Sequence, residues 1–254
     1  MNERLEKLRL AILSGGQHLR KPDEDDWGRE FRAQGLTPLQ RATERIVRLH
    51  AAEEPVIFPG ERLVYTRAAD YGCSSAARPP DVREHSCPLF TTEEWRDILD
   101  AHFSHFDGDA NGLCPRFDCL LDAGTAAAAD EVRWKRAAFS ELGEEGPAAL
   151  MDSMLRVISA IEDLAVRYRE AAQASGNPEA ASALMNVPFN RPSSFFEALL
   201  FLRILDFTLC LCSNRRVSPE RIDQYLYPYL ENDINSGVLS EEDALELVTE
   251  FFLP

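Results

Sequence analysis

The sequence predicts a mainly α-helical protein with a few short strands. Apolar residues recur at three- and four-residue spacing over several long stretches, which is the pattern of helices with one buried face. Only residues 54–66 have the extended, turn-rich character of a strand region. Because 45% of the 254 residues are apolar, the chain can bury a core as one large domain or two small ones.

The helical pattern extends over most of the chain. The longest expected helix, 146–174, has its charges opposite its apolar face and ends before Gly176. Thr37 and Pro38 fit an N-cap followed by proline at the first helical position. Helices are expected over residues 2–14, 37–52, 91–106, 117–139, 146–174, 178–186, 194–212 and 219–235, and from residue 240 onward.

Three segments break this helical pattern. Residues 54–66 are expected to be extended, with a Pro59-Gly60 turn and a short β-type run. Residues 67–90 are rich in Gly, Ser, Pro and Arg and lack periodicity, so a long irregular loop is expected there. A second loop is expected over residues 107–116.

Composition and charge exclude several classes of protein. The formal net charge of -16 argues against nucleic acid and anionic membrane surfaces as partners. The most apolar segment, 195–212, carries Glu197, Arg203 and Asp206, which favours a buried helix over a membrane span. The charged, helical start of the chain does not have the pattern of a secretory signal, so a cytoplasmic protein with reduced thiols is expected.

The segment 213–229 carries the most specific motif. It reads Ser-Asn-Arg-Arg-Val-Ser-Pro-Glu-Arg-Ile-Asp-Gln-Tyr-Leu-Tyr-Pro-Tyr and resembles a motif of the glycyl radical enzyme superfamily, which includes pyruvate formate-lyase-like and glycerol dehydratase-like enzymes. The matching positions are Ser213, Asn214, Ser218, Pro219, Arg221, Asp223, Gln224, Tyr225, Tyr227, Pro228 and Tyr229.

Four further segments are similar to segments of that superfamily, in the same order along the chain. Together they extend the resemblance over most of residues 40–254, most strongly over 187–250. The segments are 58–64 (Phe-Pro-Gly-Glu-Arg-Leu-Val), 114–124 (from Cys-Pro-Arg-Phe to Gly124), 187–199 (Val-Pro-Phe-Asn-Arg-Pro-Ser-Ser-Phe-Phe-Glu-Ala-Leu) and 230–247.

The resemblance implies a fold and a chemistry. It implies that residues 1–180 supply outer helices and loops and that residues 181–254 begin a ten-stranded β/α barrel. The implied reaction is radical cleavage of a C–O, C–N or C–C bond in a small polar substrate under anaerobic conditions, by a lyase, dehydratase or formate acetyltransferase-like enzyme. The implied partners are a small-molecule substrate and a radical-activating enzyme, with a homodimer as one arrangement.

The loops that would perform this chemistry are not in the sequence. In the superfamily a thiyl cysteine lies in a Gly-Cys-x-Glu-type loop, and a radical glycine lies in an Arg-Val-x-Gly-Tyr loop further along. The glycyl radical is installed by an activating enzyme that uses S-adenosylmethionine and an iron–sulfur cluster. We therefore expect no catalytic residue and no bound cofactor in this chain, and no turnover by this chain alone.

The resemblance also implies substrate-binding positions, namely Ser213, Asn214, Arg215, Arg216 and Ser218. Arg215-Arg216 replaces the family's Gly-His-Ser and could pair with a carboxylate or phosphate, which would favour an anionic substrate. The alternatives remain open that the arginines lie in a solvated turn or form a structural ion pair, and that Ser218 caps the next helix.

Two other functions remain as alternatives. One is a non-catalytic helical scaffold or a degenerate remnant of a radical enzyme. The other is a calcium-binding module, because Asp107-Gly-Asp-Ala-Asn-Gly112 matches the start of an EF-hand loop, although position twelve is Asp118 where Glu is expected. No metal site is predicted, because His102 and His105 are better explained by packing.

Overall fold

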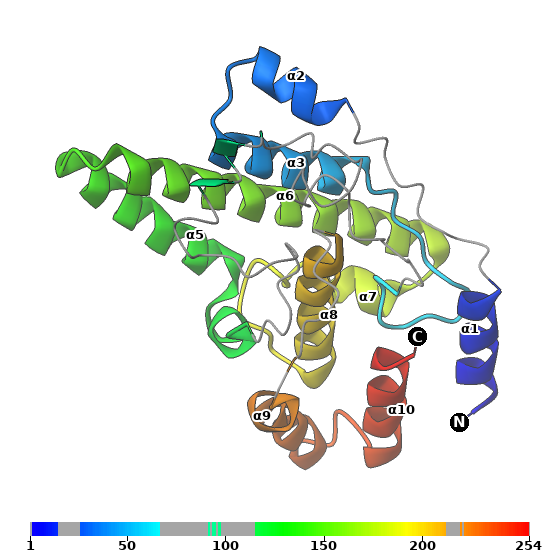
Figure 1. The fold of residues 1–254 in the computed structure, drawn as a ribbon. Coiled ribbons are helices and arrows are strands. Elements are labelled where there is room, and N and C mark those ends of the chain that lie inside the picture. The colour runs from blue at the N-terminus through cyan, green and yellow to red at the C-terminus, as the bar shows by residue number, and fades with distance from the viewer. Residues whose placement is uncertain are drawn as a thin grey trace.

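A computed structural model describes residues 2–14, 26–66, 91, 93–94, 96–97, 115–211, 219 and 221–253. Within these ranges the secondary structure is helical and contains no strand (Figure 1). The helices are α1 (Glu3–Leu13), α2 (Trp27–Ala33), α3 (Pro38–Ala52), α5 (Phe117–Glu141), α6 (Glu145–Ser175), α7 (Pro178–Ala183), α8 (Phe195–Leu211), α9 (Ile222–Asn235) and α10 (Glu241–Phe251).

Helices α3, α5 and α6 form an outer layer. The long helix α6 packs against α5 on one side and against α3 on another (Figure 1). Thr37 and Gln40 form a capping box at the start of α3, as the sequence predicts for Thr37 and Pro38. Gly176, with φ of 77°, ends α6 in the left-handed conformation, so the predicted end of the longest helix is confirmed.

Helix α8 lies at the centre of the fold. It contacts α3, α5, α6, α7, α9 and α10, and 13 of its 17 residues are buried. The prediction of a buried helix over 194–212 is therefore confirmed up to Leu211. None of the described helices is both long and apolar enough to cross a membrane.

Helix α5 starts at Phe117, as predicted, and bends at Gly124. This glycine has φ of 78°, and a Cβ atom there would lie 2.4 Å from the Phe189 carbonyl oxygen. The amides that follow donate to the same strip of backbone, Thr125 N to Pro188 O at 2.8 Å and Ala126 N to Phe189 O at 3.0 Å. The close approach therefore needs glycine, and it joins two of the segments that carry the family resemblance.

The predicted β-type run in 54–66 is wrong. In a strand these backbone N–H groups would donate to a neighbouring strand, but here they donate to side-chain carboxylates. Arg62 N and Leu63 N donate to Glu250 of α10, and Thr66 N donates to Glu61. The segment folds around these side chains as an irregular coil, while the turn at Pro59-Gly60 is present.

Helix α2 was not predicted from the sequence. It is one short helix whose buried residue Phe31 lies under the Arg48 guanidinium of α3, at 4.5 Å from the ring centroid. A helix of seven residues is too short to produce a clear periodic signal. The predicted loop 67–90 and most of the predicted helix 91–106 lie outside the described residues.

Candidate functional site

The predicted substrate-binding residues lie outside the described residues. Ser213, Asn214, Arg215, Arg216 and Ser218 fall in the gap between Leu211 at the end of α8 and Pro219 before α9. The structure therefore describes the two elements that lead into and out of this segment. The potential calcium loop 107–112 is also outside the described residues, as are His102 and His105.

The residues just after this segment are held by local contacts. Arg221 donates to both oxygens of Asp223, from Nε to Oδ1 at 3.0 Å and from Nη2 to Oδ2 at 2.9 Å. The Tyr225 hydroxyl donates to the Pro219 carbonyl at 2.7 Å. The Asp223 carboxylate is therefore already engaged by Arg221.

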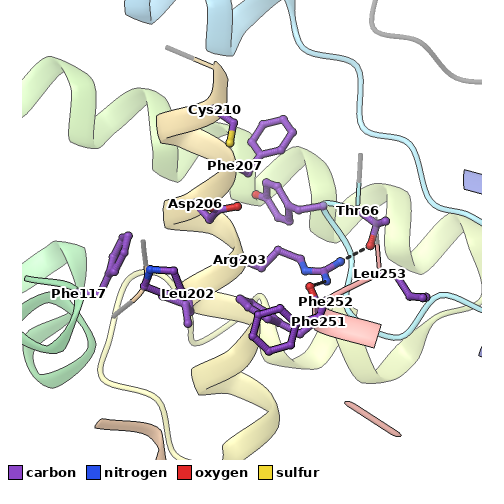
Figure 2. Close-up of a pocket in the computed structure, with 12 residues that line it drawn as sticks. Thr66, Phe117, Leu202, Arg203, Asp206, Phe207, Cys210, Phe251, Phe252 and Leu253 are labelled. Atoms are coloured by element: carbon purple, nitrogen blue, oxygen red, sulfur yellow. Dashed lines mark hydrogen bonds between the residues drawn. The ribbon is translucent and has the colours of Figure 1, made fainter. Parts of the chain in front are cut away.

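A cavity of about 360 Å³ lies beside the C-terminal half of α8. Figure 2 shows Arg203, Asp206 and Cys210 on one side of this helix, and Phe251, Phe252 and Leu253 approaching from the end of α10. Aromatic rings form much of its wall. The lining residues are Tyr65, Thr66, Phe117, Leu202, Arg203, Asp206, Phe207, Cys210, Pro219, Phe251, Phe252 and Leu253.

Arg203 joins α8 to the end of α10. Its Nη2 atom donates to the carbonyls of Glu250 at 2.8 Å and Phe251 at 2.7 Å, and its Nη1 atom donates to the Thr66 hydroxyl (Figure 2). These carbonyls are at a helix C-terminus, where a cation is favoured. Burial lowers the pKa of Arg203, while the nearby carboxylates of Glu61, Glu250 and Asp206 oppose that change.

Two buried carboxylates, those of Glu250 and Glu61, lie near Arg203. The side chain of Glu250 is fully buried and accepts from Arg62 N at 2.7 Å, Leu63 N at 2.6 Å and Arg4 Nη1 at 2.6 Å. Glu61 accepts from Phe58 N at 2.8 Å and Thr66 N at 3.0 Å. Burial raises the pKa of Glu61 to about 7, partly offset by these hydrogen bonds and by the charge of Arg203.

Asp206 differs from these carboxylates. It is half-buried and lines the cavity one turn of α8 beyond Arg203. Among the described residues no group donates a hydrogen bond to it, and its one recorded electrostatic partner is Arg203. Burial raises the pKa of Asp206, and the positive charge of Arg203 opposes this rise.

Sequence reasoning used Arg203 and Asp206 only to exclude a membrane span. Their presence inside the most apolar segment of the chain was the available signal, because charges in a buried helix need partners or a cavity. Glu61 gave no comparable signal, because it follows a Pro-Gly turn where polar residues are common. Glu250 lies in the apolar run 247–253, and this signal was not used. Asp118, the twelfth position of the possible calcium loop, is engaged by Arg116 at 2.7 and 2.8 Å.

The cysteines that the structure describes are Cys119, which is exposed, and Cys210, which is half-buried. In the described part of the chain, no three histidine, cysteine, aspartate or glutamate side chains gather as metal ligands would.

Comparisons with known proteins identify the fold and the family. Residues 84–254, more than half of the chain, match the family model described as pyruvate formate lyase-like. A probable dehydratase of Escherichia coli K12, YbiW, is 27% identical over 195 residues, which are 69% of this chain and 24% of that protein.

Solved structures show the same fold over the whole chain. Hydroxyproline dehydratase from Clostridioides difficile, solved with trans-4-hydroxy-L-proline bound, superposes with a TM-score of 0.76 at 16% identity. It is matched over 100% of this chain and 40% of its own. A glycyl radical enzyme from Archaeoglobus fulgidus gives a TM-score of 0.75 at 19% identity, over 99% of this chain and 40% of its own.

The chain thus spans a quarter to two fifths of the length of these relatives. The expected resemblance to the N-terminal part of a glycyl radical enzyme is confirmed, and so is the mainly helical fold. By the match of its residues 84–254, the chain belongs to the pyruvate formate lyase-like family of glycyl radical enzymes.

Proposed function

We propose that this chain is the N-terminal part of a glycyl radical dehydratase that acts on a small polar substrate. The observation that carries the proposal is the family match over residues 84–254. It is supported by relatives named as dehydratases, in Escherichia coli by sequence and in Clostridioides difficile by structure.

In this proposal the chain supplies scaffold and pocket rather than the radical. Residues 1–180 form outer helices and loops, and residues 181–254 begin the barrel core. The radical glycine and the thiyl cysteine would come from chain beyond Pro254, because neither of their loops is in the sequence. The activating enzyme is the partner that installs the radical, and the 254 residues alone give no turnover.

The first test is to read the source DNA past the codon for Pro254 and to express the whole open reading frame anaerobically. After treatment with an activating enzyme and S-adenosylmethionine, we expect a glycyl radical signal in electron paramagnetic resonance. We also expect loss of water from a member of a panel of diols, polyols and hydroxy acids. A stop codon at this place, or a frame without the two loops, would contradict the proposal.

The predicted substrate-binding segment allows a finer proposal. We place an anionic group of the substrate at Arg215 and Arg216, because guanidinium groups bind carboxylates and phosphates in a bidentate geometry. Replacing both arginines with Gln in the full-length enzyme should raise KM for an anionic substrate about tenfold or more while kcat changes less. An unchanged KM would remove this role.

A matched control uses two arginines far from this segment in the sequence. Arg133 and Arg136 lie exposed on α5, with 62% and 46% of their side-chain surfaces accessible. The double substitution to Gln there makes the same change in net charge. It should leave KM unchanged, which separates a local contact from a general loss of positive charge.

A further inference from the structure

The cavity beside α8 contains one charged group whose hydrogen-bonding capacity is unused among the described residues. Arg203 donates from Nη1 to Thr66 and from Nη2 to the two carbonyls that end α10, so both of its terminal nitrogens are engaged. Asp206 lines the same cavity and accepts no hydrogen bond from the described residues. A carboxylate in that position favours a ligand that brings hydrogen-bond donors and a positive charge.

The walls of the cavity suit the same kind of ligand. Phe207 comes from α8, and Phe251 and Phe252 come from the end of α10 (Figure 2). Aromatic faces attract organic cations through their quadrupoles, and an ammonium group with an apolar body contacts both the rings and the carboxylate. A volume of about 360 Å³ holds a small organic molecule.

Arg203 does not reverse this preference. Its charge interacts with the carboxylates of Glu61, Glu250 and Asp206, and its Nη2 atom binds the carbonyls that end α10. An anionic ligand in the cavity would have to approach Asp206 while both terminal nitrogens of Arg203 are already engaged. A neutral ligand would leave Asp206 with Arg203 as its one counter-charge among the described residues.

We propose that the cavity beside α8 is a binding site for a small organic ammonium ion, with Asp206 as its charged partner and Phe207, Phe251 and Phe252 as its aromatic wall. The site requires neither a radical nor turnover. Its test changes a different residue from the test at Arg215 and Arg216, and so the two proposals can fail independently.

The test uses three probes that share a benzene ring and differ in charge: the cation benzylammonium, the neutral benzyl alcohol and the anion benzoate. Binding to the 254-residue chain is measured by nuclear magnetic resonance, from shifts of the Arg203 side chain and of amides along α8. We expect benzylammonium to bind most tightly and benzoate least. Benzoate binding as tightly as benzylammonium would overturn the proposal.

Variants distinguish the site from general attraction of cations to a chain with a net charge of -16. Asp206→Asn should weaken benzylammonium binding about tenfold and leave benzyl alcohol unchanged. Asp206→Glu should retain the preference for the cation, since it keeps the charge. The matched control Asp163→Asn, which removes an exposed carboxylate of α6, should have no effect.

Unfolding does not confuse the result, because Asp206 holds no hydrogen bond in the described structure and its replacement should leave the thermal midpoint nearly unchanged. An Asp206→Asn chain that is folded and binds benzylammonium with unaltered affinity would overturn the proposal. Equal weakening by Asp206→Asn and Asp163→Asn would also overturn it, by assigning the binding to net charge alone.

Discussion

The hairpin of α5 and α6 and the buried region around α8 place their charged side chains in opposite ways. On the hairpin, the side chains of pairs such as Arg136–Asp152 and Arg133–Asp130 are about half exposed or more. Each of these side chains has water as an alternative partner. Around α8, Arg203 and Glu250 are buried and bind backbone groups from other elements.

This difference shows which charges hold the fold together. An exposed pair competes with water and contributes little, whereas a buried charge that loses its partner retains the full cost of desolvation. The chain therefore depends on a few buried contacts that join segments far apart in the sequence. The predictions below test this comparison, in order from the largest expected loss of stability to the smallest.

The Gly124 contact should be the most sensitive. In Gly124→Ala the new Cβ would lie 2.4 Å from Phe189 O and 2.7 Å from the Asn190 backbone, with φ at 78°. We expect a loss of more than about 4 kcal/mol of stability, or no folded protein, measured by urea unfolding. Gly143→Ala is the control, since φ is 73° but nothing lies within 4 Å, and about 1 kcal/mol is expected. Similar losses at both glycines would show that backbone strain, not the close approach, dominates.

Removing the Glu250 carboxylate should have the next largest effect. Glu250→Ala leaves the N–H groups of Arg62 and Leu63 without their acceptor and removes the buried partner of Arg4, so we expect a loss of about 3–5 kcal/mol. Glu246→Ala, which removes only the more exposed partner of Arg4, should cost less than about 1 kcal/mol. Equal losses in chemical denaturation would contradict the distinction between buried and exposed charge.

Glu61 should make stability fall with rising pH. Its pKa is about 7 in the folded chain and near 4.5 when unfolded, so the folded state binds the proton more tightly. Its contribution is complete below pH 4.5 and is lost as the pH rises through 7, which corresponds to about 3 kcal/mol at most. Glu61→Gln should remove this pH dependence. The difference in unfolding free energy between the two proteins should therefore change between pH 4.5 and 7. Parallel curves for the two proteins from pH 4.5 to 8 would show that Glu61 titrates normally.

The exposed pair Arg136–Asp152 should give the smallest effect. Its side chains are 46% and 52% exposed, so a double-mutant cycle with Ala at both positions should yield a coupling energy below about 0.5 kcal/mol. The coupling should shrink further at high salt concentration. A coupling above about 1.5 kcal/mol would place this pair with the buried contacts and weaken the comparison.

The helices could be predicted from sequence because their signals are local. The three- and four-residue spacing identified α3, α6 and α8, and Gly176 marked the end of α6. The error at 54–66 arose because the partner of its N–H groups is Glu250, 188 residues from Arg62 in the chain. No local pattern records an acceptor that distant.

The candidate site was less accessible to sequence reasoning. The family resemblance directed attention to residues 213–218, which the structure does not describe. The cavity beside α8 depends on side chains from separate parts of the chain, such as Thr66, Asp206 and Phe252, and only the fold brings these together. Charges inside an apolar helix were the one available indication.

The carboxylate of Glu250 also makes the attachment of α10 measurable by hydrogen exchange. The Arg62 and Leu63 amides are protected by a side chain from α10 rather than by a strand or by their own helix. Each time α10 separates from the segment 58–66, both amides become free to exchange with deuterium. Their common exchange rate therefore reports how often the last helix opens, while the amides inside α8 report unfolding of the core.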